Sequence, residues 1–222
     1  SSAASDVYKR QILFVISLFI IALGVALITR ANLGTSPAAC PPYVLSLVPG
    51  SLMTMGNYMC CMQVMFVLAQ IAILRRQFES FQLFQFAASF LFGFYTDLAM
   101  MLTVWLPGGT YALSWLWLIT GCAVMGAGIV LEIQASLLLL PGEGVVAAIS
   151  KLGHWEFHTI KIINDVVMTL TGIIIAWVMI GGIEGVREGT VVSAFLVGFM
   201  VKLFKRPLQP VEAWVNRESA LE

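Results

Sequence analysis

The chain has 222 residues, of which 59% are apolar and only 11% are charged. Lysine plus arginine equals aspartate plus glutamate at 12 each, so the formal net charge is zero. These values exclude a basic nucleic-acid-binding protein, a disordered acidic chain and a small disulfide-rich secreted domain, and they predict an integral membrane protein, because so few charges cannot cover a surface that faces water.

The first eleven residues, SSAASDVYKRQ, do not continue the apolar pattern that follows them. They resemble a translated sequencing adapter, so we expect residues 1–11 to be a non-native leader. We therefore begin the predicted membrane domain at Ile12.

Five segments come close to the length of about 20 apolar residues that a helix needs to cross a bilayer. They are Ile12–Thr29, Met55–Leu74, Phe81–Trp105, Ala112–Leu131 and Ile162–Ile180. A sixth segment, Gly189–Phe204, is shorter and carries Lys202, whose ammonium group can reach the lipid headgroups. The sequence thus predicts an all-α integral membrane protein with about six transmembrane helices.

Two of the predicted connections are apolar but broken by proline. Residues 33–48 contain Pro37, Pro41 and Pro42, and residues 137–150 contain Pro141. Irregular backbone at membrane depth survives only where it is buried in protein or lines a cavity. We expect both connections to be re-entrant segments.

The two interrupted segments belong to an internal repeat. A shift of 104 residues pairs Gly24 with Gly128 and Pro37 with Pro141, and a shift of 105 residues pairs the third predicted span with the sixth. Each copy holds three spans, an odd number, so the second copy enters the membrane from the opposite side. Inverted repeats with matching interrupted segments are typical of secondary transporters.

This repeat divides the chain into four parts. We expect residues 1–11 to be the leader, 12–108 the first membrane repeat, 109–206 the second, and 207–222 a cytoplasmic tail. The excess of lysine and arginine in the connections then favours both termini in the cytoplasm. The expected cytoplasmic residues are Arg75, Arg76, Lys151, Lys161, Lys202, Lys205, Arg206 and Arg217, against Arg30 and Arg187 outside.

Three runs carry a family resemblance: GVALITRANLGTSP at 24–37, GFYTDL at 93–98 and EGTVVSAFLVGF at 188–199. The chain resembles the YczE/YitT-type family of bacterial integral membrane proteins over nearly all of its length after the leader. The resemblance implies a multi-pass protein of the bacterial cytoplasmic (inner) membrane and implies no reaction. The second interrupted segment departs from the pattern, because Leu137–Gly144 lacks a second Leu-Gly-x-x-Pro.

Polar residues near the two interrupted segments are the candidate solute-binding groups. Arg30 ends the first span, Asn32 and Ser36 follow it, and Glu143 lies between two glycines in the second interrupted segment. A half-helix that begins at Pro37 would aim free N–H groups and its positive dipole end into the protein. The predicted binding residues are Arg30, Asn32, Ser36, Glu143 and Asn164, and with Arg30 among them they favour a small anion. The alternatives are a simple turn without a ligand and, for Asn164, a bond to a neighbouring helix.

Charged residues near the spans are the candidate coupling or ion-pair groups, because charges are costly inside a bilayer. These are Asp97, Glu132, Asp165 and Lys202. We expect an outer pair of Arg30 with Asp97 and an inner cluster of Glu132, Lys161, Asp165 and Lys202. The alternatives are interfacial charges, structural pairs at helix ends and lysines that reach the headgroups.

The sequence shows no catalytic motif, so we expect no enzyme, no cofactor and no metal site. We expect a secondary transporter of a small, anionic solute that works by alternating access between the two repeats. The alternative is a non-transporting membrane protein that acts as an assembly or regulatory partner. The expected partners are the lipid bilayer, an unidentified small solute and, as an open alternative, further copies of the chain in a homo-oligomer; no nucleic acid is expected.

Overall fold

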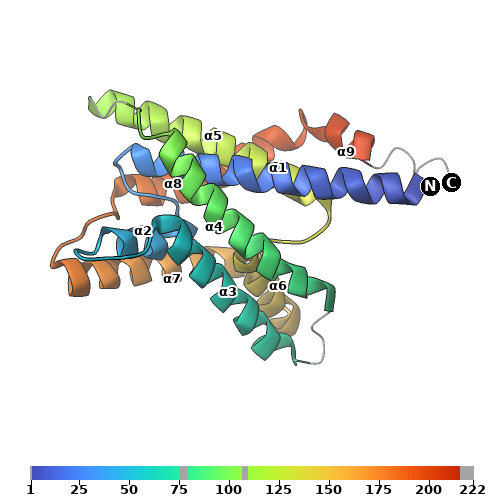
Figure 1. Ribbon diagram of the computed structural model, residues 1–222, viewed down its shortest axis with the longest axis horizontal. Helices are drawn as coiled ribbons and strands as arrows, with labels where there is room; N and C mark the ends of the chain where they lie inside the picture. Colours follow the sequence, from blue (N-terminus) through green and yellow to red (C-terminus); the bar gives the residue numbers. More distant parts are fainter. Residues whose placement is uncertain (1, 76–79, 107–109, 216–222) are drawn as a thin grey trace.

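The computed structural model describes residues 2–75, 80–106 and 110–215, and in these ranges every regular element is a helix (Figure 1). The elements in chain order are α1 (Ser2–Arg30), η1 (Pro37–Ala39), α2 (Cys40–Leu47), α3 (Met55–Leu74), η3 (Ser80–Leu83), α4 (Phe84–Leu102), α5 (Tyr111–Ala135), α6 (Pro141–Gly153), α7 (Phe157–Ile175), η4 (Ala176–Ile180), α8 (Glu188–Lys205) and α9 (Gln209–Val215). The predicted boundary between the repeats at 108 and 109, and the part of the predicted tail beyond 215, lie outside the described residues.

Five of the helical segments are long and apolar enough to cross a bilayer. They are Val7–Arg30, Met55–Leu74, Phe81–Leu102, Tyr111–Ala135 and Phe157–Ile180. The prediction of an all-α, multi-pass membrane protein is confirmed at this level. Helix α8 is not among the five, because its 18 residues carry three charged side chains, Glu188, Lys202 and Lys205.

Helix α1 begins at Ser2 and continues without a break to Arg30. The leader predicted at 1–11 therefore supplies the first turns of α1, and no helix boundary marks residue 11. At the other end of the chain, α9 packs on α1 and α5, and Trp214 lies under the ammonium group of Lys9 at 5.7 Å from the ring centre.

The centre of the structure is the antiparallel pair of α1 and α5, which lie side by side in Figure 1. Glycines let the two backbones approach closely. A methyl group added at Gly24 would lie 2.5 Å from the Cβ of Met125, and one added at Gly128 would lie 2.9 Å from the backbone nitrogen of Ile21. The side of α1 that meets α5 and its neighbours is mostly apolar and buried, with Leu18, Ile21, Ala22, Val25 and Ala26 at its core.

The other helices pack around this pair so that most contacts made by helices of the first half have a counterpart in the second half. Helix α4 packs on α1 as α8 packs on α5, and α6 packs on α3 as α2 packs on α7. One pairing has no counterpart of similar extent: α3 packs on α4, but α7 does not pack on α8 to a comparable degree. Gly93 of α4 is in tight contact with Gly56 of α3, whereas a methyl group added at Gly198 of α8 would meet nothing within 4 Å.

The two proline-broken segments form the short helices α2 and α6, which begin inside the protein. Proline occupies the first turn of each, where its missing N–H costs no hydrogen bond. The residues that precede these helices, Ala39 and Leu140, belong to one buried apolar cluster that also contains Leu18 and Ile21 of α1. The starts of α2 and α6 thus lie against the middle of the central helix pair.

The close contact of α1 with α5 yields a test. Gly24→Ala places a methyl group against the backbone of Met125, so we expect a loss of about 1–3 kcal/mol from overpacking. The matched control is Gly198→Ala, which enters open space in another helix and should be neutral or stabilise by up to about 1 kcal/mol through helix propensity. The measurement is the thermal unfolding midpoint in detergent. Equal midpoints for the two variants would contradict the packing described here.

Candidate functional site

The connection from α1 to α2 is anchored to the start of α8. The N–H of Gly189 donates to the carbonyl of Leu33 at 2.8 Å, and the N–H of Thr35 donates to Oγ1 of Thr190 at 3.2 Å. Gly34 has φ +112° and its Cα lies against Thr190, so a residue with a side chain would be strained there. These contacts fix residues 33–36 between α1 and α8.

Arg30 and Ser36 flank this connection with unsatisfied polar atoms. Nη2 of Arg30 donates to the carbonyl of Met100 at 2.8 Å, but its Nε is buried and has no partner among the described residues. Ser36 is 2% exposed, and its Oγ likewise has no partner among them. Arg30 also acts electrostatically on Tyr43 of α2, as does Glu184. A cation and a buried hydroxyl therefore lie near the first turns of η1 and α2.

Asn32 was predicted to bind the solute, but the bond described for it, to Arg187, is made by its backbone. It is exposed and has φ +55°, a conformation that asparagine tolerates better than most residues. Its carbonyl oxygen accepts a hydrogen bond from Nη1 of Arg187 at 3.0 Å. This hydrogen bond ties the connection after α1 to the residue that precedes α8.

Asp97 holds the start of α3 instead of pairing with Arg30. Its Oδ1 accepts from the N–H of Gly56 at 2.8 Å, and its Oδ2 accepts from Oγ1 of Thr54 at 2.5 Å. A carboxylate at a helix N-terminus satisfies free N–H groups and complements the helix dipole. The predicted pair of Arg30 with Asp97 is wrong for this reason, since each side chain bonds to another group.

The start of α6 is held by three polar side chains from neighbouring helices. Oε1 of Glu132 accepts from the N–H of Leu140 at 2.8 Å, and Oε1 of Gln63 accepts from the N–H of Gly142 at 3.2 Å. Nε2 of Gln70 donates to the carbonyl of Pro141 at 3.0 Å. The backbone where α6 begins is thus satisfied by protein groups, as a segment inside a membrane protein requires.

A group of charged side chains surrounds this turn. Glu132 of α5 is 1% exposed, and Glu143 of α6 is half-buried and acts on it electrostatically. Lys161 and Asp165 of α7 form an ion pair of 2.8 Å and both act on Glu143. Three residues of the predicted inner cluster are therefore brought together, with Glu143 between them.

Two further predicted residues, Lys202 and Asn164, are not part of this charged group. Lys202 is exposed on α8 and is not among the charged groups that act on Glu132 or Glu143, so within the described residues the structure does not bring it into the predicted inner cluster. Asn164 is half-buried on α7, next to Asp165.

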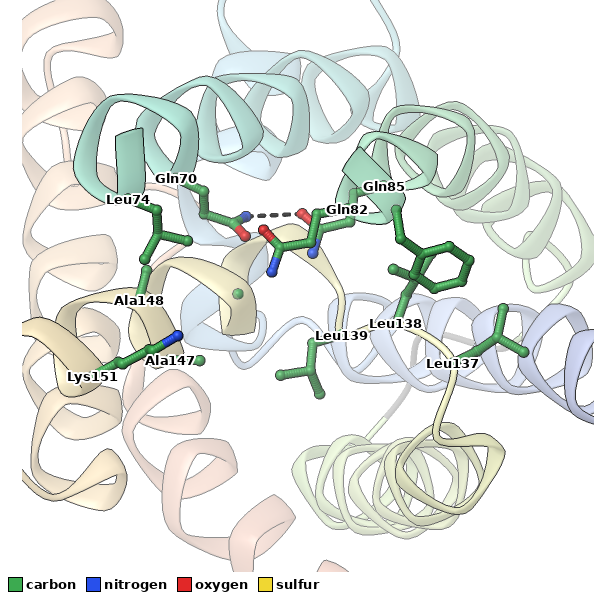
Figure 2. A pocket seen from close by; sticks show the side chains of 12 residues that line it. Gln70, Leu74, Gln82, Gln85, Leu137, Leu138, Leu139, Ala147, Ala148 and Lys151 are labelled. Atoms are coloured by element: carbon green, nitrogen blue, oxygen red, sulfur yellow. Dashed lines mark hydrogen bonds between the residues drawn. The ribbon is translucent and has the colours of Figure 1, made fainter. Parts of the chain in front are cut away.

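A cavity of about 240 Å3 opens beside α6 (Figure 2). Three glutamines from α3, η3 and α4 face it, and Nε2 of Gln70 donates to Oε1 of Gln85 at 3.0 Å. Oε1 of Gln82 is buried and has no partner among the described residues. Lys151 enters the cavity from α6, and Leu137–Leu139 form the apolar wall. The cavity combines hydrogen-bonding amides with one cation.

The sequence analysis missed the glutamines. Gln63 and Gln70 are seven residues apart in an otherwise apolar span, so they lie on one face of the helix. Amides at such positions in membrane helices usually bond to a neighbouring helix. That spacing was the signal that could have predicted a polar contact for α3, although not its partner.

In the part of the chain that the structure describes, no three histidine, cysteine, aspartate or glutamate side chains lie together in a way that could hold a metal ion. The four cysteines have free thiols, of which Cys40 and Cys122 are buried. The chemistry available around α2 and α6 is therefore hydrogen bonding and charge.

The contacts of Gln70 yield a second test. Gln70→Leu removes the bonds to Gln85 and Pro141 and leaves buried oxygens unsatisfied, so we expect a loss of about 1–3 kcal/mol. Amide hydrogen exchange should also become faster in the first turns of α6. The matched control is Gln209→Leu at an exposed position of α9. Unchanged exchange in α6 would show that Gln70 does not hold it.

A model of a protein family described as a family of unknown function (DUF6198) matches residues 8–206 of the chain. The match does not show the YczE/YitT-type family that the sequence motifs suggested, so that finer assignment stays a prediction. No curated protein and no solved structure matches the chain.

Proposed function

The chain belongs to this family of unknown function, and we propose that it is a secondary transporter that carries a small anionic solute between two inverted halves. The observation that carries this proposal is the pair of short helices, α2 and α6, that begin inside the protein at matching places in the sequence. Half-helices at matching positions of inverted repeats form the binding sites of many transporters.

The contacts of α1 with α5 support the inverted repeat. The sequence shift of 104 residues pairs Gly24 with Gly128 and Ile21 with Met125. The contact of Gly24 with Met125 and the contact of Gly128 with Ile21 therefore exchange under this shift. A pair of antiparallel helices with exchangeable contacts is what a two-fold axis through their crossing point would produce. The packing of α4 on α1 matches that of α8 on α5, and the packing of α6 on α3 matches that of α2 on α7, which extends the same relation.

The second half is more open than the first. A shift of 105 residues pairs Gly93 with Gly198, and only Gly93 is packed against a neighbouring helix. The missing extensive contact of α7 with α8 leaves these helices free to approach or separate without breaking a packed interface. Alternating access requires such a change in contact between one group of helices and another.

The two helix starts differ in charge, which favours an anion at α2. Glu132 and Gln63 accept N–H bonds at the start of α6. The positions that correspond to them around α2, Ile28 of α1 and Val167 of α7, are apolar, and neither η1 nor α2 has a side-chain cap. Pro41 and Pro42 carry no N–H and the N–H of Cys40 donates to the carbonyl of Pro37, so the start of α2 offers an anion its positive dipole end and the nearby Arg30, without free N–H donors.

In this proposal the other polar groups have separate roles. Ser36 supplies a hydroxyl to the anion, Glu132 contributes to coupling, and the glutamine-lined cavity beside α6 is an aqueous vestibule on the opposite side. We also propose that α8 is a sixth span. Its first turn bonds to Leu33 next to the end of α1, and Leu208, in the turn that follows α8, bonds to Gln134 at the end of α5. Because α1 and α5 are antiparallel, these two contacts lie at opposite ends of the central helix pair.

A sixth span can be tested by labelling single cysteines in a background without the native ones. Ile183→Cys and Arg206→Cys should react with a membrane-impermeant maleimide from opposite sides of the bilayer. Leu52→Cys is the control and should react from the same side as Ile183→Cys, because Leu52 and Met179 line one surface hollow. Labelling of Ile183→Cys and Arg206→Cys from one side would show that α8 does not cross.

Transport itself is tested by uptake into proteoliposomes of radiolabelled phosphate, sulfate, acetate and succinate. We expect at least one anion to enter faster than into protein-free liposomes. Arg30→Ala should reduce that uptake by roughly 10- to 100-fold, as expected for the loss of a charged hydrogen bond. The charge-matched control, Arg206→Ala, lies beyond α8 and should transport normally.

Two results would contradict this assignment in different ways. Uptake that is unaffected by Arg30→Ala would remove Arg30 from the site. Absence of uptake for the whole panel would favour the alternative, a non-transporting membrane protein, for which the open face of α8 at Gly198 and the little-buried α7 offer room for a partner helix.

A further inference from the structure

Glu132 is a sealed carboxyl group at the start of α6 with half of its hydrogen-bonding capacity unused. Its Oε1 accepts the N–H of Leu140, but its Oε2 is buried and has no partner among the described residues. The side chain as a whole is 1% exposed. A buried carboxylate oxygen without a donor is costly, so the missing donor calls for an explanation.

Glu143 lies in the first turn of α6, next to the backbone that Glu132 holds. It is the third residue of the helix, after Pro141 and Gly142. In a capping box the glutamate at this position reaches back toward the N–H of the residue that precedes the helix. That residue is Leu140, and its N–H is already taken by Glu132. Glu143 makes no such cap bond in the described structure, but its carboxyl group acts electrostatically on that of Glu132, so both belong to the surroundings of this turn.

The charges around the two glutamates do not neutralise both of them. Lys161 and Asp165 of α7 face Glu143, and these two are paired with each other at 2.8 Å. With both glutamates ionised, the four groups would hold three negative charges and one positive. Two carboxylates that share a poorly solvated site cannot both stay ionised at low cost.

We propose that Glu132 and Glu143 hold one proton between them, and that this proton is the coupling ion of the transport cycle; the coupling role rests on the function proposed above. A proton on Oε2 of Glu132 donates to a carboxylate oxygen of Glu143, which supplies the missing hydrogen bond and removes the repulsion. Glu143 is half-buried, as are Lys161 and Asp165, so the proton enters and leaves through Glu143 while Glu132 stays sealed.

The same proton changes the strength of the hydrogen bond between Glu132 and the N–H of Leu140, which holds the start of α6. An ionised Glu132 is a strong cap for the N–H of Leu140, because a charged acceptor bonds roughly twice as strongly as a neutral one. When Glu132 carries the proton, the cap weakens, and the bonds from Gln63 and Gln70 remain. Proton occupancy is thus linked to the start of the half-helix.

The test is infrared spectroscopy of the purified full chain in lipid at neutral pH, because a protonated carboxyl group has a carbonyl stretch that carboxylates lack. We expect one such band in the unmodified protein. Glu132→Gln should abolish it, and Glu143→Gln should shift its frequency, because an amide then replaces the carboxylate that accepts the hydrogen bond while Glu132 stays buried. The control Glu156→Gln at an exposed position should leave it unchanged. Glu143→Gln decides the result if Glu132→Gln fails to fold.

Each other outcome has a defined meaning. Absence of the band, its survival in Glu132→Gln, or an unchanged frequency in Glu143→Gln overturns the shared proton. Loss of the band when sodium chloride replaces choline chloride overturns it in favour of a sodium site. For any anion taken up by proteoliposomes, Glu143→Gln should abolish stimulation by a pH gradient. A band without any uptake supports the proton pair and removes its coupling role, so the two proposals fail independently.

Discussion

The structure depends on the close contact between α1 and α5. Glycine at 24 and 128 lets the two backbones meet without intervening side chains, which creates a rigid antiparallel pair at the centre. Every other long helix is placed relative to this pair, either directly, as for α4 and α8, or through α2, α3, α6 and α7. Because the contact exchanges under the sequence shift of 104 residues, it also sets the relation between the two halves on which the proposed alternating access rests.

The second constraint is that backbone groups inside a membrane protein need partners within the protein. The two short helices meet this constraint in different ways. The start of α6 is held by a carboxylate and two amides from α3 and α5. The connection before α2 is held by hydroxyls instead, with Thr29 bonded to Thr35 and Thr35 bonded to Thr190. Among the buried polar atoms that have no partner in the described part of the chain, Ser36 Oγ and Glu132 Oε2 lie beside these two starts, and the proposals assign a ligand or a proton to them.

Charged residues that look alike in the sequence therefore have different surroundings. Asp97 is occupied by the N-terminus of α3, and Asp165 by Lys161, so each is largely committed to a structural bond. Glu132 and Arg30 each keep one buried atom without a partner. Such an atom costs free energy unless a ligand or a proton satisfies it, which is why the proposed chemistry rests on these two residues.

The sequence alone determined the all-α membrane architecture, the five long apolar helices and the location of two short proline-broken helices, because length, hydropathy and proline act locally. It also located Arg30, Ser36, Glu132 and Glu143 as polar residues beside those helices. Only the tertiary structure decided their partners. Asp97 bonds to α3 because these helices are neighbours, whereas Lys202 is exposed on α8 and does not act on the buried Glu132, although α8 packs on α5. The glutamines of α3 acquire their role in the same way, since α6 reaches them from 70 or more residues away in the chain.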